Sequence, residues 1–228
     1  MTAPATSAAD TAVVLVAHGT VESLDDLPRF LANIRRGHAA PPELVAEAIG
    51  GRSPLLDITR EVARKLEKAL ELKARVAMRL FEPYPKEVVA KLASEGIRRV
   101  VAVPLAQHSA GVYGSAMQAA AKEVDPSLEV FCARNWGRTP ELTRAFADTI
   151  IAELDRIPAG EAEQTALVLT AHSLPRAVVQ AGDPYEQEVR ASAEDVAAEV
   201  RARVGDRFAE HMVAFQSQGI GTGVEWLG

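Results

Sequence analysis

Cysteine is almost absent from this chain, since Cys132 is the single one among 228 residues. One cysteine excludes internal disulfides and cannot by itself hold an iron–sulfur cluster. The surrounding run Leu-Glu-Val-Phe-Cys-Ala is mostly apolar. We therefore expect Cys132 to lie in a strand and to pack as a small hydrophobic side chain.

Long apolar runs and an excess of positive charge are also missing. No apolar stretch approaches the ~20 residues that a membrane-spanning helix needs, and the first ten residues lack the basic start and apolar core of a signal peptide. The net charge is −6, which argues against a broad nucleic-acid-binding surface. The composition therefore favours a cytoplasmic enzyme that acts on small molecules and does not bind nucleic acid.

The common catalytic signatures are absent as well. The sequence contains no Gly-x-x-x-x-Gly-Lys phosphate loop, no Gly-x-Gly-x-x-Gly after a strand and no Gly-x-Ser-x-Gly turn. It also lacks Cys-x-x-Cys and His-Glu-x-x-His. The usual nucleotide-binding, hydrolase and zinc-protease classes are therefore not indicated.

Two similar segments stand out instead. Residues 165–175 read Thr-Ala-Leu-Val-Leu-Thr-Ala-His-Ser-Leu-Pro, and residues 11–20 read Thr-Ala-Val-Val-Leu-Val-Ala-His-Gly-Thr. The histidines of the two segments, His172 and His18, fall in the same register. Such a repeat predicts two similar halves of the chain.

Each of these segments is continuously apolar before its histidine. This pattern is typical of a strand covered by helices on both faces of a parallel sheet, where ligands bind beyond the carboxyl ends of the strands. Imidazole binds metals such as iron, cobalt and zinc, and it exchanges protons near neutral pH. His18 and His172 are therefore candidate site residues, although either one alone is also compatible with an ordinary loop-end residue. His108 in the loop 107–113 is a third, weaker candidate.

Strand and helix patterns alternate along the first half, which predicts a doubly wound parallel α/β sheet there. We expect two domains, 1–138 and 139–228. The second domain is expected to have only two strands. Two strands do not make a self-sufficient sheet, so this domain is expected to be incomplete. The strands are expected within 11–20 and at 74–80, 100–105, 128–133, 165–171 and 211–215. The main helices are expected near 23–36, 54–72, 85–96, 114–124, 139–158 and 183–205.

Polar residues at two helix ends complete the set of candidates. Arg35 and Arg36 lie at the end of the first helix, where they either complement the helix dipole or face an anionic ligand. After two glycines, Ser53 and Pro54 are expected to be the N-cap and first residue of the next helix.

Taken in order, the motifs of this chain resemble those of ferrochelatases, and most closely the bacterial type that acts on coproporphyrin III. The matching pieces cover nearly the whole chain: Val16-Ala17-His18-Gly19-Thr20, Ile34-Arg35-Arg36-Gly37, Ile49-Gly50-Gly51-Arg52-Ser53-Pro54-Leu55, Thr170-Ala171-His172-Ser173-Leu174-Pro175, Gly182-Asp183-Pro184-Tyr185 and Phe215-Gln216-Ser217-Gln218-Gly219 through Trp226-Leu227-Gly228. The resemblance implies two similar flavodoxin-like, chelatase-like halves with the site in a cleft between them.

The activity implied by this resemblance is insertion of Fe²⁺ into a porphyrin during haem biosynthesis, with coproporphyrin III favoured over protoporphyrin IX. His172 would then bind the metal or accept pyrrole protons, and His18 would approach the porphyrin and metal. Arg35 would contact a propionate, and Ser53 would line the porphyrin pocket. The porphyrin and ferrous iron are substrates, no prosthetic group is expected, and peripheral contact with a membrane is compatible with the family.

The chain also departs from the family pattern. The coproporphyrin enzymes usually carry a tyrosine at the position of His18, and Met117 occupies another expected tyrosine position. The family continues beyond Trp226-Leu227-Gly228 to a glutamate that partners the catalytic histidine, so the chain is expected to be a shortened form. Two alternatives follow: a sirohydrochlorin or cobalt chelatase that uses His18 and His108, and a porphyrin- or haem-binding protein without catalytic activity.

Overall fold

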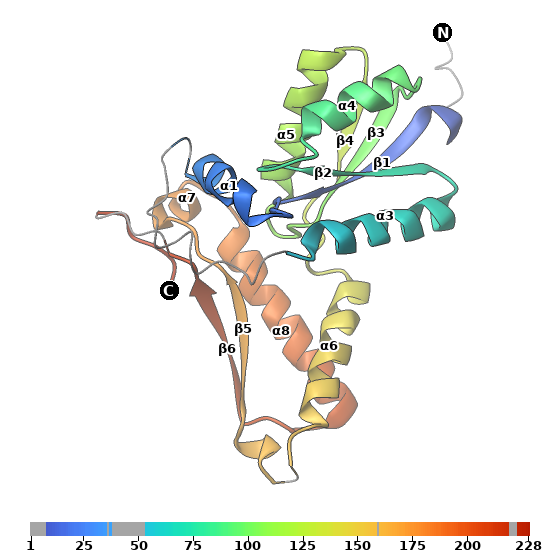
Figure 1. Cartoon of the computed structure of the whole chain (residues 1–228). Helices are drawn as coiled ribbons and strands as arrows, with labels where there is room; N and C mark the ends of the chain where they lie inside the picture. The colour runs from blue at the N-terminus through green and yellow to red at the C-terminus, as the bar shows by residue number, and fades with distance from the viewer. Residues whose placement is uncertain (1–7, 36, 38–52, 159, 219–222) are drawn as a thin grey trace. The chain divides into compact units, whose positions relative to one another are not determined.

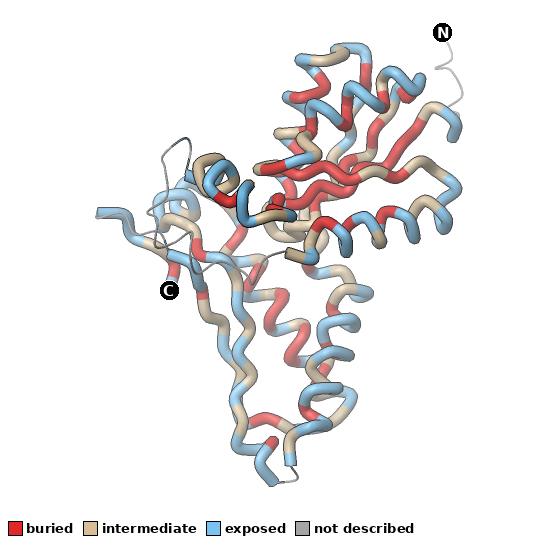
Figure 2. The backbone as a smooth tube through the Cα atoms, in the orientation of Figure 1, coloured by how far each residue is buried: buried red, intermediate tan, exposed pale blue. Residues whose placement is uncertain are grey.

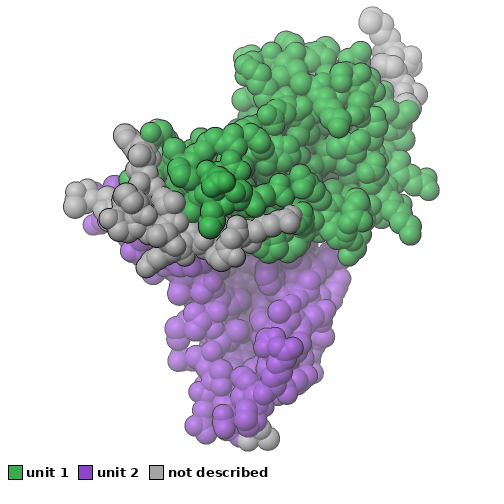
Figure 3. Space-filling model, in the orientation of Figure 1, with its two compact units in different colours: residues 1–134 green, residues 135–228 purple. Residues whose placement is uncertain are grey.

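A computed structural model describes residues 8–35, 37, 53–158, 160–218 and 223–228. The chain divides into two compact units, residues 1–134 and 135–228 (Figure 3). The domain division predicted from the sequence lies at residue 138. Both units combine helices with a parallel sheet, which confirms the predicted α/β class.

Unit 1 contains a four-stranded sheet in the order β2-β1-β3-β4. All neighbouring strands are parallel, and β1 is paired on both sides. The carboxyl ends of β2, β1 and β3 therefore lie next to one another. The strands are β1 (Thr11–Ala17), β2 (Lys73–Met78), β3 (Arg99–Pro104) and β4 (Glu129–Cys132).

Helices cover both faces of this sheet, as the continuous apolar pattern of the first strand predicts (Figure 1). Val14 and Val16 of β1 pack with residues of α4 and α5, whereas Leu15 and Ala17 pack with residues of α3. Every residue of β1 is buried (Figure 2). The helices of unit 1 are α1 (Leu27–Ile34), α3 (Leu55–Leu70), α4 (Pro85–Ser94) and α5 (Ala110–Val124), with short 3₁₀ turns η1 (Ala8–Asp10) and η2 (Leu24–Asp26).

Two helix starts differ from the sequence-based expectation. Helix α3 begins at Leu55, with Pro54 as its N-cap residue, and the Ser53 hydroxyl accepts a hydrogen bond from the Leu55 N–H across 3.3 Å. Ser53 thus satisfies a helix N–H from one position further out than expected. Helix α5 begins at Ala110 rather than near Gly114, because the loop residues after β3 continue directly into the helix.

Helix α5 lies against β4 at a point of very close contact. A Cβ atom placed on Gly114 would lie 2.8 Å from both Cβ and Sγ of Cys132. Because real Cβ atoms do not approach other atoms so closely, only glycine fits there without a shift. Cys132 is the last residue of β4, which confirms that this cysteine is a strand residue.

Unit 2 contains a two-stranded parallel sheet of β5 and β6. Ala147 and Leu154 of α6 pack with Ala197 and Val200 of α8, and Leu167 of β5 contacts this cluster. The strands are β5 (Ala166–His172) and β6 (Glu210–Gln216), and the helices are α6 (Pro140–Leu154), α7 (Arg176–Gln180) and α8 (Tyr185–Val204), with a 3₁₀ turn η4 (Ala162–Gln164).

The expectation that the strand before His172 is covered on both faces is wrong. Along β5 exposed and half-buried residues alternate, and Val168 is 48% exposed. On the neighbouring strand Met212 is 43% exposed. The reason is that the helices of unit 2 pack against one face of this small sheet, so the other face remains open among the described residues (Figures 1 and 2).

Within the last described residues, 223–228, Trp226 is half-buried and Leu227 is buried. Leu227 is 1% exposed, and its N–H donates to the Leu174 carbonyl oxygen across 3.0 Å. Pro175 and Trp226 form an antiparallel bridge. Trp226 and Leu227 therefore hold the loop that follows β5, through the bridge to Pro175 and the backbone hydrogen bond to Leu174.

No helix within the described part of the chain is long and apolar enough to cross a membrane.

Candidate active site

His172 is the last residue of β5, and its side chain is held by the next residue. Its Nδ1 atom lies 2.7 Å from the Ser173 carbonyl oxygen. A carbonyl oxygen can only accept, so Nδ1 must carry the hydrogen of the neutral imidazole. The lone pair is then on Nε2, where it can bind a metal ion or take up a proton.

The main chain around His172 is fixed by several hydrogen bonds. The Tyr185 hydroxyl donates to the His172 carbonyl oxygen across 2.9 Å. The Ser173 N–H donates to the Gln216 carbonyl oxygen across 2.6 Å, and the Ser173 hydroxyl donates to the Leu227 carbonyl oxygen across 2.8 Å. Ser173 itself is fully buried. A rigid backbone thus presents His172, whose own residue surface is exposed.

His18 follows β1 directly and is also exposed. Its Nδ1 atom lies 3.1 Å from the hydroxyl of Tyr113, a residue in the first turn of α5 that is 8% exposed. Burial raises the pKa of Tyr113, and the nearby Arg79 opposes that shift. The pair joins the turn after β1 to the first turn of α5 at the carboxyl edge of the unit 1 sheet.

Arg79 comes immediately after β2 and completes this arrangement. Its guanidinium carbon lies 5.7 Å from the centre of the Tyr113 ring, which is within cation–π range. The Arg79 N–H donates to the Ala17 carbonyl oxygen across 2.9 Å. Arg79, Tyr113 and His18 therefore meet where three neighbouring parallel strands end.

Gly19 explains why the chain can turn directly after His18. Its φ angle is +111°, and a Cβ atom there would lie 2.9 Å from the Phe81 nitrogen. The Leu80 N–H donates to the His18 carbonyl oxygen across 2.8 Å. The backbone of residues 80–81 thus sits directly against this turn, so that both the angle and the space require glycine.

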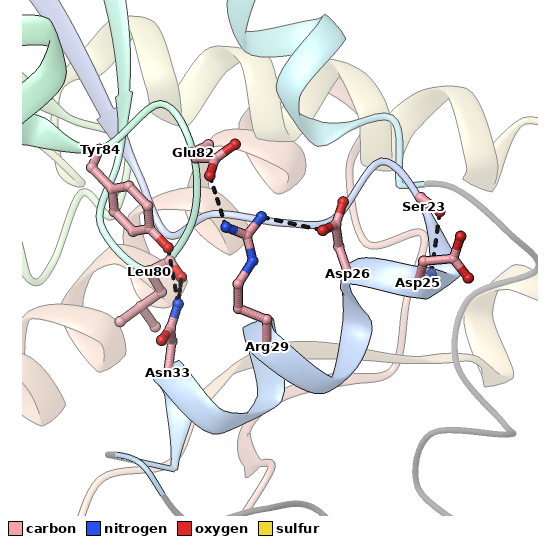
Figure 4. A network of polar contacts seen from close by, with 8 residues as sticks. All are labelled: Ser23, Asp25, Asp26, Arg29, Asn33, Leu80, Glu82 and Tyr84. Atoms are coloured by element: carbon pink, nitrogen blue, oxygen red, sulfur yellow. Dashed lines mark hydrogen bonds and ion pairs between the residues drawn. The ribbon is translucent and has the colours of Figure 1, made fainter.

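Arg35 is the exposed C-cap residue of α1, so the structure places it at the predicted helix end. The helix is tied to the loop after β2 by the polar network in Figure 4. Arg29 pairs with Glu82 across 2.8 Å, and Asn33 donates to the Tyr84 hydroxyl across 3.0 Å. Other bonds of the network are Arg29 with Asp26 at 3.2 Å, Asn33 with the Leu80 carbonyl oxygen at 3.0 Å and Asp25 N–H with Ser23 at 3.2 Å.

Several predicted pieces lie outside the described residues: Arg36, the Gly-Gly-Arg part of the motif before Ser53, and Gly219. Ser53 itself is half-buried at the start of α3. His108 is half-buried in the loop between β3 and α5, and its Nδ1 atom is buried. Among the described residues there is no group of three or more His, Cys, Asp or Glu side chains that could hold a metal ion.

Sequence reasoning missed Tyr113 and Arg79. Tyr113 was visible only as part of the loop after His108, and Arg79 was assigned to the interior of a strand. A cation at the end of an apolar strand, followed by a loop that returns to the same sheet edge, was the available signal. This sequence pattern could not show that Arg79, Tyr113 and His18 lie next to one another.

These features define a class of α/β proteins in which imidazoles stand at the carboxyl ends of parallel strands. The Ferrochelatase family model matches residues 10–228. The chain belongs to the ferrochelatase family, whose members are enzymes that insert Fe²⁺ into a porphyrin in haem biosynthesis.

Individual relatives agree with the family match. The chain is 31% identical over 236 residues to a ferrochelatase of Herpetosiphon aurantiacus, covering 96% of this chain and 75% of the relative. It is 31% identical to a coproporphyrin III ferrochelatase of Listeria monocytogenes, covering 95% and 73%. It is 34% identical to a ferrochelatase of Acidobacterium capsulatum, covering 95% and 71%.

Proposed function

We propose that this chain inserts Fe²⁺ into coproporphyrin III in preference to protoporphyrin IX. The family match supports metal insertion, and the Listeria monocytogenes relative is named for coproporphyrin III. In the reaction the porphyrin loses its two inner N–H protons as Fe²⁺ binds the four ring nitrogens. The protein must therefore supply a base and hold a dianionic ring around the incoming metal.

The observation that carries this proposal is the tautomer of His172. Because Nδ1 donates to the Ser173 carbonyl oxygen across 2.7 Å, the Nε2 lone pair remains for the reaction. A neutral imidazole nitrogen is a suitable general base for a pyrrole proton and a suitable ligand for Fe²⁺. We assign His172 as the catalytic residue on this basis.

The porphyrin contacts are proposed from the family pattern and are compatible with local structure. Arg35, an exposed guanidinium at a helix end, suits a propionate. Ser53 already accepts a backbone hydrogen bond across 3.3 Å, and its hydroxyl hydrogen is available to donate as well. His18 is proposed to contact the porphyrin, and the chelatase-like domains are proposed to span residues 1–138 and 139–228. A cytoplasmic location stays part of the proposal.

A second candidate function is porphyrin or haem binding without metal insertion. It is favoured by the observation that, within the described residues, His172 has no group of carboxylates and imidazoles around it that could hold a metal ion. Such a protein would bind the macrocycle but leave it unmetallated. A sirohydrochlorin or cobalt chelatase is a third reading, which metal and tetrapyrrole preference would separate.

The deciding experiment is anaerobic mixing of the purified chain with coproporphyrin III and Fe²⁺, followed through the absorption bands of the porphyrin. Conversion to the metallated spectrum well above the protein-free rate would support the enzyme. Parallel mixtures with protoporphyrin IX, and with Co²⁺ in place of Fe²⁺, test the substrate preference. A shifted porphyrin spectrum without metallation would instead favour the binding protein.

A further inference from the structure

The two equivalent histidines are held by partners of opposite character. His172 Nδ1 faces a carbonyl oxygen, which can only accept a hydrogen bond. His18 Nδ1 faces the hydroxyl of Tyr113 across 3.1 Å, and a hydroxyl can donate. The sequence repeat therefore does not guarantee the same chemistry at both positions.

The hydroxyl of Tyr113 is a hydrogen-bond donor on a largely buried side chain, so an acceptor close to it matters. The side chain is 8% exposed, and within the described part of the chain His18 Nδ1 is the hydrogen-bond partner of its hydroxyl. An imidazole nitrogen is a stronger base than a phenol oxygen, and burial raises the pKa of Tyr113 so that the phenol keeps its proton. The hydroxyl is therefore the better donor and Nδ1 the better acceptor, an arrangement in which the hydrogen of neutral His18 lies on Nε2.

In this tautomer His18 offers no lone pair to a metal ion. Nδ1 is occupied by the Tyr113 hydrogen, and Nε2 carries its own. Metal binding at His18 would require breaking the bond to a nearly buried phenol, or moving a proton. The His18–Tyr113 pair is therefore unlike the His172–Ser173 pair, whose free lone pair suits a base or a metal.

Arg79 supplies a positive charge at the same place. It is half-buried, and no carboxylate pairs with it among the described residues. The neighbouring Arg75 of β2, by contrast, pairs with Glu67 and Glu95 at 3.7 Å each. Most other arginines of unit 1 are paired in the same way: Arg29, Arg60, Arg64, Arg98 and Arg99.

A half-buried guanidinium without a paired carboxylate is partly desolvated, and an anionic ligand would offset that loss of hydration. Its planar fork matches a carboxylate, and the Tyr113 ring beneath it limits its orientation. It stands at the carboxyl ends of three adjacent parallel strands, where such sheets bind ligands. Porphyrin substrates carry propionate carboxylates.

We propose that Arg79, oriented by Tyr113, binds a carboxylate of the tetrapyrrole, and that Tyr113 is a positioning residue that keeps His18 in the tautomer with hydrogen on Nε2. This subsite rests on the proposed function, since it takes the same substrate. It assigns the edge of unit 1 to substrate recognition and leaves metal chemistry to His172.

The first test compares coproporphyrin III with its neutral tetramethyl ester, both presented to the full chain in the same non-ionic detergent. Arg79→Gln is expected to weaken binding of the free acid about tenfold and to leave ester binding unchanged, because one charge-assisted hydrogen-bonded contact is lost. Arg75→Gln, which removes an equal charge from β2 just before Arg79, is the matched control and should change neither. Unchanged binding of the free acid, or equal weakening of both porphyrins, would overturn the proposal.

The second test measures the tautomers directly by nitrogen-15 NMR of the histidine rings in the unliganded protein. His18 is expected as the Nε2–H form and His172 as the Nδ1–H form. Tyr113→Phe, which keeps the ring but removes the donor, should shift His18 toward a tautomer mixture without unfolding the chain. Finding wild-type His18 in the Nδ1–H form would refute the role of Tyr113.

The two proposals fail separately. If the wild-type chain metallates coproporphyrin III while Arg79→Gln keeps its porphyrin affinity, the subsite is wrong and the enzyme assignment stands. If the free acid binds in an Arg79-dependent way without metallation, the subsite stands and the enzyme assignment is wrong.

Discussion

The hydroxyl of Tyr185, at the start of α8, donates a hydrogen bond across 2.9 Å to the main-chain carbonyl oxygen of His172, at the end of β5. Tyr185 is 8% exposed and packs near the Phe215 ring. The start of α8 therefore holds the backbone of His172, the proposed catalytic residue, without a hydrogen bond to its imidazole ring.

Tyr185→Phe tests this relationship. Loss of the hydroxyl leaves a carbonyl oxygen without its partner, so we expect the free energy of unfolding in urea to fall by about 1–2 kcal/mol. The kcat of metal insertion should fall several-fold while KM for porphyrin stays within about twofold, because only the base is displaced. Tyr84→Phe, which loses a bond to Asn33 in the other unit, should lower stability without lowering kcat. An equal drop in kcat for both variants would argue against a specific link to His172.

His172→Ala should abolish metal insertion and leave porphyrin affinity within a few fold. The reason is that the Nε2 lone pair is removed while the buried Ser173 and its bonds to the backbone remain. Stopped-flow absorption under anaerobic conditions measures the rate, and porphyrin titration measures affinity. The control is His211→Ala on β6, whose imidazole contacts Glu194 at 3.0 Å. Wild-type metallation by His172→Ala would remove His172 from the mechanism.

Gly19→Ala should be among the more destabilising small changes in unit 1. The residue has φ +111°, and the new Cβ would lie 2.9 Å from the Phe81 nitrogen. Backbone strain and overpacking together should lower the free energy of unfolding by roughly 2–4 kcal/mol. Gly96→Ala separates the two causes, since Gly96 has φ +82° but nothing within 4 Å of a new Cβ. Gly96→Ala should lower the free energy of unfolding by only about 1–2 kcal/mol. Equal losses of unfolding free energy in both variants would contradict the close contact at Gly19.

Alkaline pH provides a test of the buried phenol. Burial raises the pKa of Tyr113 above its usual value of about 10. The unfolded chain therefore loses this proton first as pH rises, so stability is present below pH ~10 and declines above it. Tyr113→Phe lacks this contribution. Urea unfolding from pH 8 to 11 should show a steeper alkaline decline for the wild type than for the variant, and parallel curves would show that the phenol is not protected.

Unit 1 could be predicted in detail because its apolar runs are long and regular. The run before His18 has helices on both sides, so a continuous pattern and continuous burial coincide. The nearly identical run before His172 alternates in exposure, because burial depends on what packs against a strand and not on the strand alone. The short helix α7 was missed since five residues give little periodicity.

The candidate site was predicted in part. The strand-end positions of His172 and His18 and the helix-end position of Arg35 were predicted correctly, while their roles toward a porphyrin stay predictions. The partner of His18 lies 95 residues further along the chain, and no local pattern connects the two. The tautomer of His172 depends on where one carbonyl oxygen points, which is a property of the folded loop.

The close contact between Gly114 and Cys132 has a consequence for following the molecule in solution. Cys132 is half-buried against Gly114 of α5, and burial raises the pKa of its thiol, so alkylating reagents should react more slowly with it than with an exposed thiol. The chain has no other cysteine, so every label reports the same event. Helix α5 also carries Tyr113, so an increase in the labelling rate of the thiol would report movement of this helix away from β4 without any introduced probe.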